Sequence, residues 1–94
     1  MIFVDTLRPC GAPWRGGVAC HLVSDESEDE LLSFAAVLGI PRAWFQRGSI
    51  PHFDLSPSLR ARAIALGATP VDRRGFVEAT RRLRARAASA AAVD

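Results

Sequence analysis

Ninety-four residues, 49% of them hydrophobic and 23% charged, suffice for one domain with a single modest core. No apolar run approaches the length of a membrane span, and a formal net charge of +2 is too small to indicate a partner by itself. We expect one domain over residues 1–88 and a frayed tail at 89–94. The first residues lack the basic and apolar regions of a secretion signal, which predicts a cytoplasmic protein.

The first quarter of the chain predicts two strands joined by a loop. Residues 2–4 form a short apolar run that is typical of a strand. Residues 6–16 contain two prolines and two glycines, and this composition indicates a loop. Residues 18–23 are again apolar and predict a second strand near the centre of a sheet.

The strongest helix signals follow the second strand. Ser27 and Glu30 have the spacing of a capping box, in which the hydroxyl and the carboxylate bind the free amides at a helix start. Gly39 follows the apolar stripe of this helix and is expected to end it with a positive φ. The remaining predicted elements are a helical turn at 41–45, a short strand at 52–55, a helix from Ser56 to Gly67, a short strand at 68–71, and a last helix capped by Asp72.

The predicted order of elements is β-β-α-β-α-β-α. Strands that alternate with helices after residue 18 are typical of parallel strands joined by right-handed crossovers. We therefore predict an α/β fold with a small, mainly parallel sheet of about four short strands and three helices.

The chain has two histidines, and both lie in predicted strands. His52 and Asp54 are two residues apart, so on a strand their side chains share one face. His21 lies in the second strand, and Asp5 ends the first one. An imidazole with a near-neutral pKa beside a carboxylate suits acid–base catalysis. The alternative is that His52 and Asp54 only hydrogen-bond to loop backbone and fix a turn.

Cationic side chains near these residues suggest an anion anchor. Arg60 lies one turn into the helix capped by Ser56, where free amides and a guanidinium are suited to a phosphate or a carboxylate. Trp14 and Arg15 offer a stacking surface and a second cation. The alternatives are a solvated Arg60, or one paired with a carboxylate, and an ordinary lead-in to the second strand at Trp14 and Arg15.

We predict no cofactor and no metal ligand set. The spacing of the histidines and carboxylates is not diagnostic of a metal site. Cys10 and Cys20 lack a metal-ligand spacing, and a disulfide between them is not expected in a cytoplasmic protein. No glycine-rich phosphate loop or nucleophile elbow is present.

Charge is unevenly distributed along the chain, with five acids within residues 25–30 and six arginines within residues 73–86. This polarity suits a non-catalytic module that binds a protein partner or a second copy of the chain through the last helix. Nucleic-acid binding is a weaker alternative, because the arginines surround the helix and Phe76 is its one aromatic residue. Helix capping and ordinary solvation account for the same charges. The arginines are Arg73, Arg74, Arg81, Arg82, Arg84 and Arg86.

Several short motifs, in this order, resemble the bacterial and phage proteins of domain-of-unknown-function family 4031. The resemblance covers roughly residues 2–75 and implies no activity. The motifs are Val4-Asp5, Cys20-His21-Leu22-Val23 followed by Asp25, Asp29-Glu30-Leu31, Leu38-Gly39, Arg42-Ala43-Trp44-Phe45-Gln46, His52-Phe53-Asp54-Leu55, Ser58-Leu59-Arg60-Ala61 and Leu66-Gly67-Ala68.

The chain departs from the family pattern at three positions. Thr6, Leu32 and Leu59 stand where the pattern has an acid, a histidine and a lysine, and the segment before the first helix is about one residue longer. A site built on those groups is not expected here. The candidates that match the pattern are Asp5, Trp14, His21, Asp25, Trp44, His52, Asp54 and Arg60.

These observations lead to one primary hypothesis. We expect a small acid–base enzyme acting on a small anionic or nucleotide-like molecule, with His52, Asp54 and His21 as the catalytic groups. The expected substrate-binding residues are Arg60, Arg15, Trp14, Asp5 and Trp44.

Overall fold

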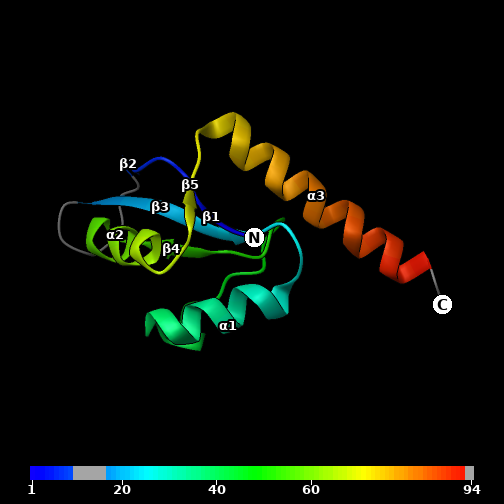
Figure 1. Ribbon diagram of the computed structural model, residues 1–94, viewed down its shortest axis with the longest axis horizontal. Helices are drawn as coiled ribbons and strands as arrows, with labels where there is room; N and C mark the ends of the chain where they lie inside the picture. The colour runs from blue at the N-terminus through cyan, green and yellow to red at the C-terminus, as the bar shows by residue number, and fades with distance from the viewer. Residues whose placement is uncertain (10–16, 93–94) are drawn as a thin grey trace.

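The computed structural model describes residues 1–9 and 17–92, which form a mixed five-stranded sheet with helices on both faces (Figure 1). The α/β class and the three predicted helices are confirmed. The strands are β1 (Ile2–Val4), β2 (Arg8–Pro9), β3 (Val18–Ser24), β4 (Phe53–Leu55) and β5 (Thr69–Pro70). The helices are α1 (Glu28–Leu38), α2 (Pro57–Ala65) and α3 (Arg73–Ala92), with a short 3₁₀ turn η1 at Arg42–Trp44.

The prediction of a mainly parallel sheet is wrong. Strand β3 is antiparallel to β1, β2 and β4, and among the described pairings only β1 with β5 is parallel. No described helix lies between β1 and β3, so the chain reverses into an antiparallel neighbour without a crossover. After α1 the chain turns again where Gln46 and His52 exchange backbone hydrogen bonds of 3.0 and 2.9 Å, and β4 enters antiparallel.

The fifth strand lies in the segment predicted to be a loop. Arg8 and Pro9 pair with Ala19 and Val18 as β2, so the prediction of about four strands is one short. Pro9 fits there because β2 is a two-residue edge strand, where a missing N–H is tolerated. The rest of the predicted loop, residues 10–16, lies outside the described residues.

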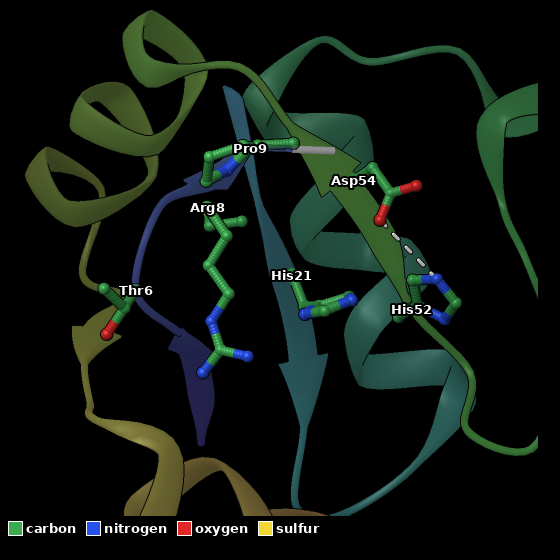
Figure 2. A pocket seen from close by; sticks show the side chains of 8 residues that line it. Thr6, Arg8, Pro9, His21, His52 and Asp54 are labelled. Atoms are coloured by element: carbon green, nitrogen blue, oxygen red, sulfur yellow. Dashed lines mark ion pairs between the residues drawn. The ribbon is translucent and has the colours of Figure 1, made fainter. Parts of the chain in front are cut away.

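Strand β3 is the centre of the sheet. Leu22 pairs with Val4 of β1 on one edge and with Phe53 of β4 on the other. Figure 2 shows β2 on the same side of β3 as β1, and β4 on the opposite side. Residues of β3 therefore face neighbours that come from both halves of the chain.

Alternation along β3 divides the core between the two faces of the sheet. Cys20 and Leu22 pack into the larger cluster, which includes the buried residues of α1 and α2. Val23 packs on the other face with Phe3 and with Ala79 of α3. His21 points to the α3 side because it is two residues before Val23.

Both predicted ends of α1 are confirmed, but the capping box is only half formed. The Ser27 hydroxyl accepts a hydrogen bond from the Glu30 amide, and Gly39 ends the helix with a φ of 90°. The Glu30 carboxylate instead binds the Ser24 hydroxyl and the Met1 amine. The tertiary structure thus takes the carboxylate away from its local partner.

The α-amine of Met1 lies among the acids of the α1 region. It donates to Asp25, Glu26 and Glu30 at 2.8, 3.0 and 3.0 Å. Burial lowers its pKa, but these hydrogen bonds outweigh burial and raise the pKa from 8.0 to about 10. Asp25 also accepts from Arg82 of α3 at 3.0 Å, so the cluster joins the chain start to α1 and α3.

We expect acetylation of this amine to destabilise the protein in a pH-dependent way. A folded-state pKa above the unfolded value contributes stability that is fully present below pH 8 and is lost as the pH rises through about 10. The loss is about 1 kcal/mol or less, because the amine is largely solvent-exposed. Urea unfolding of acetylated and free protein between pH 7 and pH 10.5 measures the difference, which should vanish at the upper end. A difference independent of pH would contradict the assignment.

Helix α3 begins as predicted, since the Asp72 carboxylate accepts from the Gly75 amide at 2.8 Å. Thr80 and Leu83 are buried against the body of the protein, and residues 84–90 are exposed. Figure 1 shows this part of α3 extending away from the sheet. Fraying of residues 89–94 stays a prediction. None of the described helices has the length and apolarity needed to cross a membrane.

Candidate functional site

The two histidines and Asp54 come together on the face of the sheet that α3 partly covers (Figure 2). His21 is opposite Asp54 in the pairing of β3 with β4, and His52 precedes Asp54 by two residues. The imidazole rings are edge to face with centroids 5.2 Å apart. His52 Nε2 lies 3.6 Å from Asp54 Oδ1.

Asp5 fixes the orientation of His21. One carboxylate oxygen accepts from the His21 backbone amide at 2.6 Å, and the other accepts from Nδ1–H at 2.7 Å. The Asp5 side chain is only 4% exposed. This bond raises the pKa of His21 above 6.5, while burial opposes the shift. In the neutral ring the proton is on Nδ1, and the Nε2 lone pair faces the pocket.

The backbone of the preceding turn orients the His52 ring. Its Nδ1 lies 2.8 Å from the carbonyl oxygen of Ile50, and a carbonyl can only accept, so Nδ1 carries the proton. The bridge between Gln46 and His52 holds this turn in place. The neutral ring again leaves the Nε2 lone pair free, on the side of Asp54.

Gln46 orients the carboxylate of Asp54. Its side-chain amide donates to Oδ2 at 2.7 Å, and Oδ1 remains on the side of His52. Gln46 was not among the residues predicted from the sequence. The signal that would have found it is the turn that brings residue 46 beside residue 52, and no local pattern predicts that pairing.

One acceptor atom from each of the three residues points toward the others. These atoms of His21, His52 and Asp54 all lie within 4.8 Å of one another. They open into a pocket of about 290 Å³, which Figure 2 shows from close by. The lining residues are Thr6, Arg8, Pro9, Ala19, Cys20, His21, His52 and Asp54.

Phe76 of α3 packs against His21. The two rings are tilted by 31° with centroids 5.2 Å apart. An aromatic ring here limits how far the imidazole can rotate and excludes water from one of its sides. Helix α3 thereby takes part in the site although its arginines do not line the pocket.

Arg60, the predicted anion anchor, faces the backbone of Asp5. Its Nε donates to the Asp5 carbonyl oxygen at 2.9 Å, and Arg60 does not line the pocket. Arg8 does line the pocket, and its side chain forms no hydrogen bond or ion pair within the described part of the chain. Figure 2 shows its side chain beside His21, where its charge opposes, without cancelling, the rise in the pKa of that histidine that the Asp5 hydrogen bond causes. Among the described residues, the arginine that lines the pocket is therefore one that sequence patterns did not single out.

The other predicted residues are dispersed. Trp44 lies in η1, is 47% exposed and does not line the pocket. Asp5 lies behind His21 rather than in the pocket lining. Asp25 directly follows the C-terminal end of β3, where its carboxylate accepts hydrogen bonds from the Met1 amine and from Arg82. Trp14 and Arg15 lie outside the described residues.

Cys20 is not a candidate nucleophile. It is buried and forms no disulfide among the described residues. Burial and the Asp5 charge raise its pKa to about 12, so the thiol stays protonated at neutral pH. Its side chain packs with the core on the other face of the sheet.

The site lies within a segment that matches a known family model. The model, described as a protein of unknown function (DUF4031), matches residues 2–86 of the chain. None of the curated proteins and none of the solved structures compared with the chain matches it. The match extends beyond residues 2–75, where the motifs resemble the family, and includes most of α3.

Proposed function

The chain belongs to the DUF4031 family of unknown function, and since that description names no reaction, we propose from the site geometry that it is an acid–base enzyme. Its substrate is a small anionic or nucleotide-like molecule that enters the pocket of His21, His52 and Asp54. One neutral imidazole accepts a proton at Nε2 from the attacking hydroxyl or water, and the other, in its protonated form, donates its Nε2 proton to the leaving group.

One observation carries this proposal. Both Nδ1–H groups are already bound, by Asp5 and by the Ile50 carbonyl, so both imidazoles present Nε2 to the same pocket. A structural histidine usually has its polar atoms satisfied by the fold. Here two histidines leave the same atom free toward each other, and in a chain with only two histidines this convergence supports a shared chemical role.

Arg8 supports the choice of an anionic substrate. Its side chain borders the pocket next to His21, and a guanidinium binds carboxylates and phosphates through two parallel hydrogen bonds. The predicted anchor, Arg60, contributes indirectly, because its bond to the Asp5 carbonyl holds the backbone that presents Asp5 to His21. A cytoplasmic location stays a prediction.

The test is conversion of a substrate panel by tag-free protein. Proton and phosphorus NMR would follow nucleotides, phosphate monoesters and small carboxylates, each incubated with protein in the presence and absence of divalent cations. We expect conversion of at least one compound, its loss in His52→Gln, and a raised KM in Arg8→Gln. Asp29→Asn, an exposed acid of α1, is the control and should match the wild type. Conversion that survives in His52→Gln would contradict the proposal.

A second candidate function is self-association through α3. Residues 84–90 are exposed on a helix that extends away from the sheet, and Ala87 and Ala90 border a groove whose lining also includes Glu26, Glu28 and Pro51. The acids at 25–30 offer the opposite charge on the same molecule. Light scattering at increasing concentration should reveal a dimer that 0.5 M salt weakens. A monomer at every concentration removes this candidate, and salt-sensitive oligonucleotide binding would favour nucleic acid instead.

A further inference from the structure

We infer that His21 Nε2, His52 Nε2 and Asp54 Oδ1 together bind one divalent transition-metal ion, with zinc as the expected ion. This goes beyond the sequence, whose spacing predicted no metal. It deepens the proposed function and rests on it for its catalytic consequence, because with both Nε2 atoms bound to the metal a metal-bound water would act as the base in place of a free imidazole. The binding itself is independent of any activity.

The first argument is the excess of acceptors. Three atoms that can only accept when the imidazoles are neutral lie within 4.8 Å of one another. No described side chain donates a hydrogen bond to any of the three. Lone pairs that converge in this way repel each other unless a cation lies between them. A metal ion satisfies all three atoms together, whereas a single proton satisfies at most two.

The second argument is that each ligand residue has a hydrogen-bond partner on the side away from the proposed metal. Asp5 accepts from Nδ1–H of His21, the Ile50 carbonyl accepts from Nδ1–H of His52, and the Gln46 amide donates to Oδ2 of Asp54. Metal-binding histidines almost always donate their other N–H to a carboxylate or a carbonyl in this manner. All three ligands therefore have a partner that fixes their orientation before any ion arrives.

The donor set favours zinc over magnesium or calcium. Two imidazole nitrogens with one carboxylate suit zinc and its transition-metal neighbours, whereas magnesium and calcium prefer oxygen ligands. Tetrahedral zinc with bonds of about 2.1 Å places its ligand atoms about 3.4 Å apart. His52 Nε2 and Asp54 Oδ1 are already 3.6 Å apart. The other pairs of these atoms lie within 4.8 Å, so their separations would have to shrink by at most about 1.4 Å to fit the same geometry.

Three protein ligands leave a fourth position open toward the pocket. Structural zinc sites use four protein ligands, while catalytic ones keep a position for water or substrate. Zinc held by these three ligands would lower the pKa of a water in the fourth position to near neutral. Arg8 borders the same pocket and would hold the anionic end of a substrate near that water.

A second group of acids does not support a metal site. Asp25, Glu26 and Glu30 also bring oxygen atoms together. These carboxylates already form ion pairs with two cations, the Met1 amine and Arg82. Within the described residues, no cation is bound to the three converging atoms of the histidine group, whereas the acidic group has two.

The test is a zinc titration of chelator-stripped, tag-free protein, with competition against a chromophoric chelator. We expect one zinc per chain, and with cobalt the intense visible absorption of a tetrahedral site. His52→Gln and Asp54→Asn should each weaken zinc binding about 10- to 100-fold, and Asp29→Asn should bind like the wild type. Circular dichroism confirms that the variants fold. No zinc binding, or equal binding by His52→Gln, overturns the inference, and so does a tighter affinity for magnesium.

The inference and the proposed function fail separately. If stripped protein converts a substrate without metal, and zinc neither binds nor accelerates the reaction, the metal inference is wrong and the acid–base proposal stands. If one zinc binds through these residues and no compound is converted with any metal, the proposed function is wrong and the metal site stands.

Discussion

Replacing Asp5 with asparagine is expected to disable the site while leaving the fold intact. The expected mechanism is a reversal of the His21 tautomer. We expect metal affinity to fall about 10- to 100-fold, and any acid–base activity to fall by at least as much. Few single-atom changes in this chain should affect function so strongly.

The expected change of the His21 tautomer follows from the two hydrogen bonds that the Asp5 carboxylate accepts. The His21 backbone N–H must find an acceptor, so the amide oxygen of asparagine takes the place of Oδ1. The amide nitrogen then faces Nδ1 of the ring at the position of Oδ2. Since that nitrogen is a donor, Nδ1 must accept, and the ring proton moves to Nε2. The lone pair that faced His52 and Asp54 is lost.

Nitrogen-15 NMR of the two imidazoles measures this directly. The wild type should show the proton of both neutral rings on Nδ1, and Asp5→Asn should show it on Nε2 of His21 alone. His52 serves as the internal control, because its Nδ1 is bound by the Ile50 carbonyl. An unchanged His21 tautomer with unchanged zinc affinity would contradict the assigned role of Asp5.

Replacing Phe53 with alanine is expected to cost about 3–5 kcal/mol of unfolding free energy. Phe53 has no exposed surface, and it lies on the middle of the sheet opposite Leu22 of β3. Its ring also packs on that of Phe45 at 5.4 Å. Domains of this size are typically stable by 5–15 kcal/mol, so the variant would lose a large part of the total. It would also loosen β4, which carries Asp54.

Urea unfolding followed by circular dichroism measures the loss. Val37→Ala is the matched control, because Val37 is 69% exposed on α1 and its truncation creates no cavity. We expect a change below about 0.5 kcal/mol for the control. A loss below about 1 kcal/mol for Phe53→Ala would mean that Phe53 is not central to the core.

The helices were predictable because their signals are local. Ser27 and Gly39 bound α1, Ser56 caps α2 through the Leu59 amide, and Asp72 caps α3 through Gly75. Each signal acts within four residues of itself. Burial depends less on local signals, and Leu66, directly after α2, is 47% exposed although it is a large apolar residue. At the end of a helix, the spacing of its apolar residues no longer determines which other residues cover a side chain.

The direction of the strands was not predictable from the alternation of elements. Alternating strands and helices indicate parallel strands only where a helix crosses from one strand to the next. Among the described elements, β4, α2 and β5 form such a unit. Strands β4 and β1 are both antiparallel to β3, and β5 is parallel to β1, so β4 and β5 run in the same direction. The turn between Gln46 and His52 reverses the chain before β4, and its hydrogen bonds link residues six apart. That reversal brings Asp54 opposite His21.

The sequence by itself determined the helices and the capped ends, the α/β class, and the shared face of His52 and Asp54, because each depends on neighbours along the chain. Only the tertiary structure decided that Asp5 binds Nδ1 of His21, that Arg8 rather than Arg60 borders the pocket, and that both Nε2 atoms meet. The contacts of His21 with Asp5 and with His52 join residues 16 and 31 positions apart, and strand pairing, not local propensity, places them together.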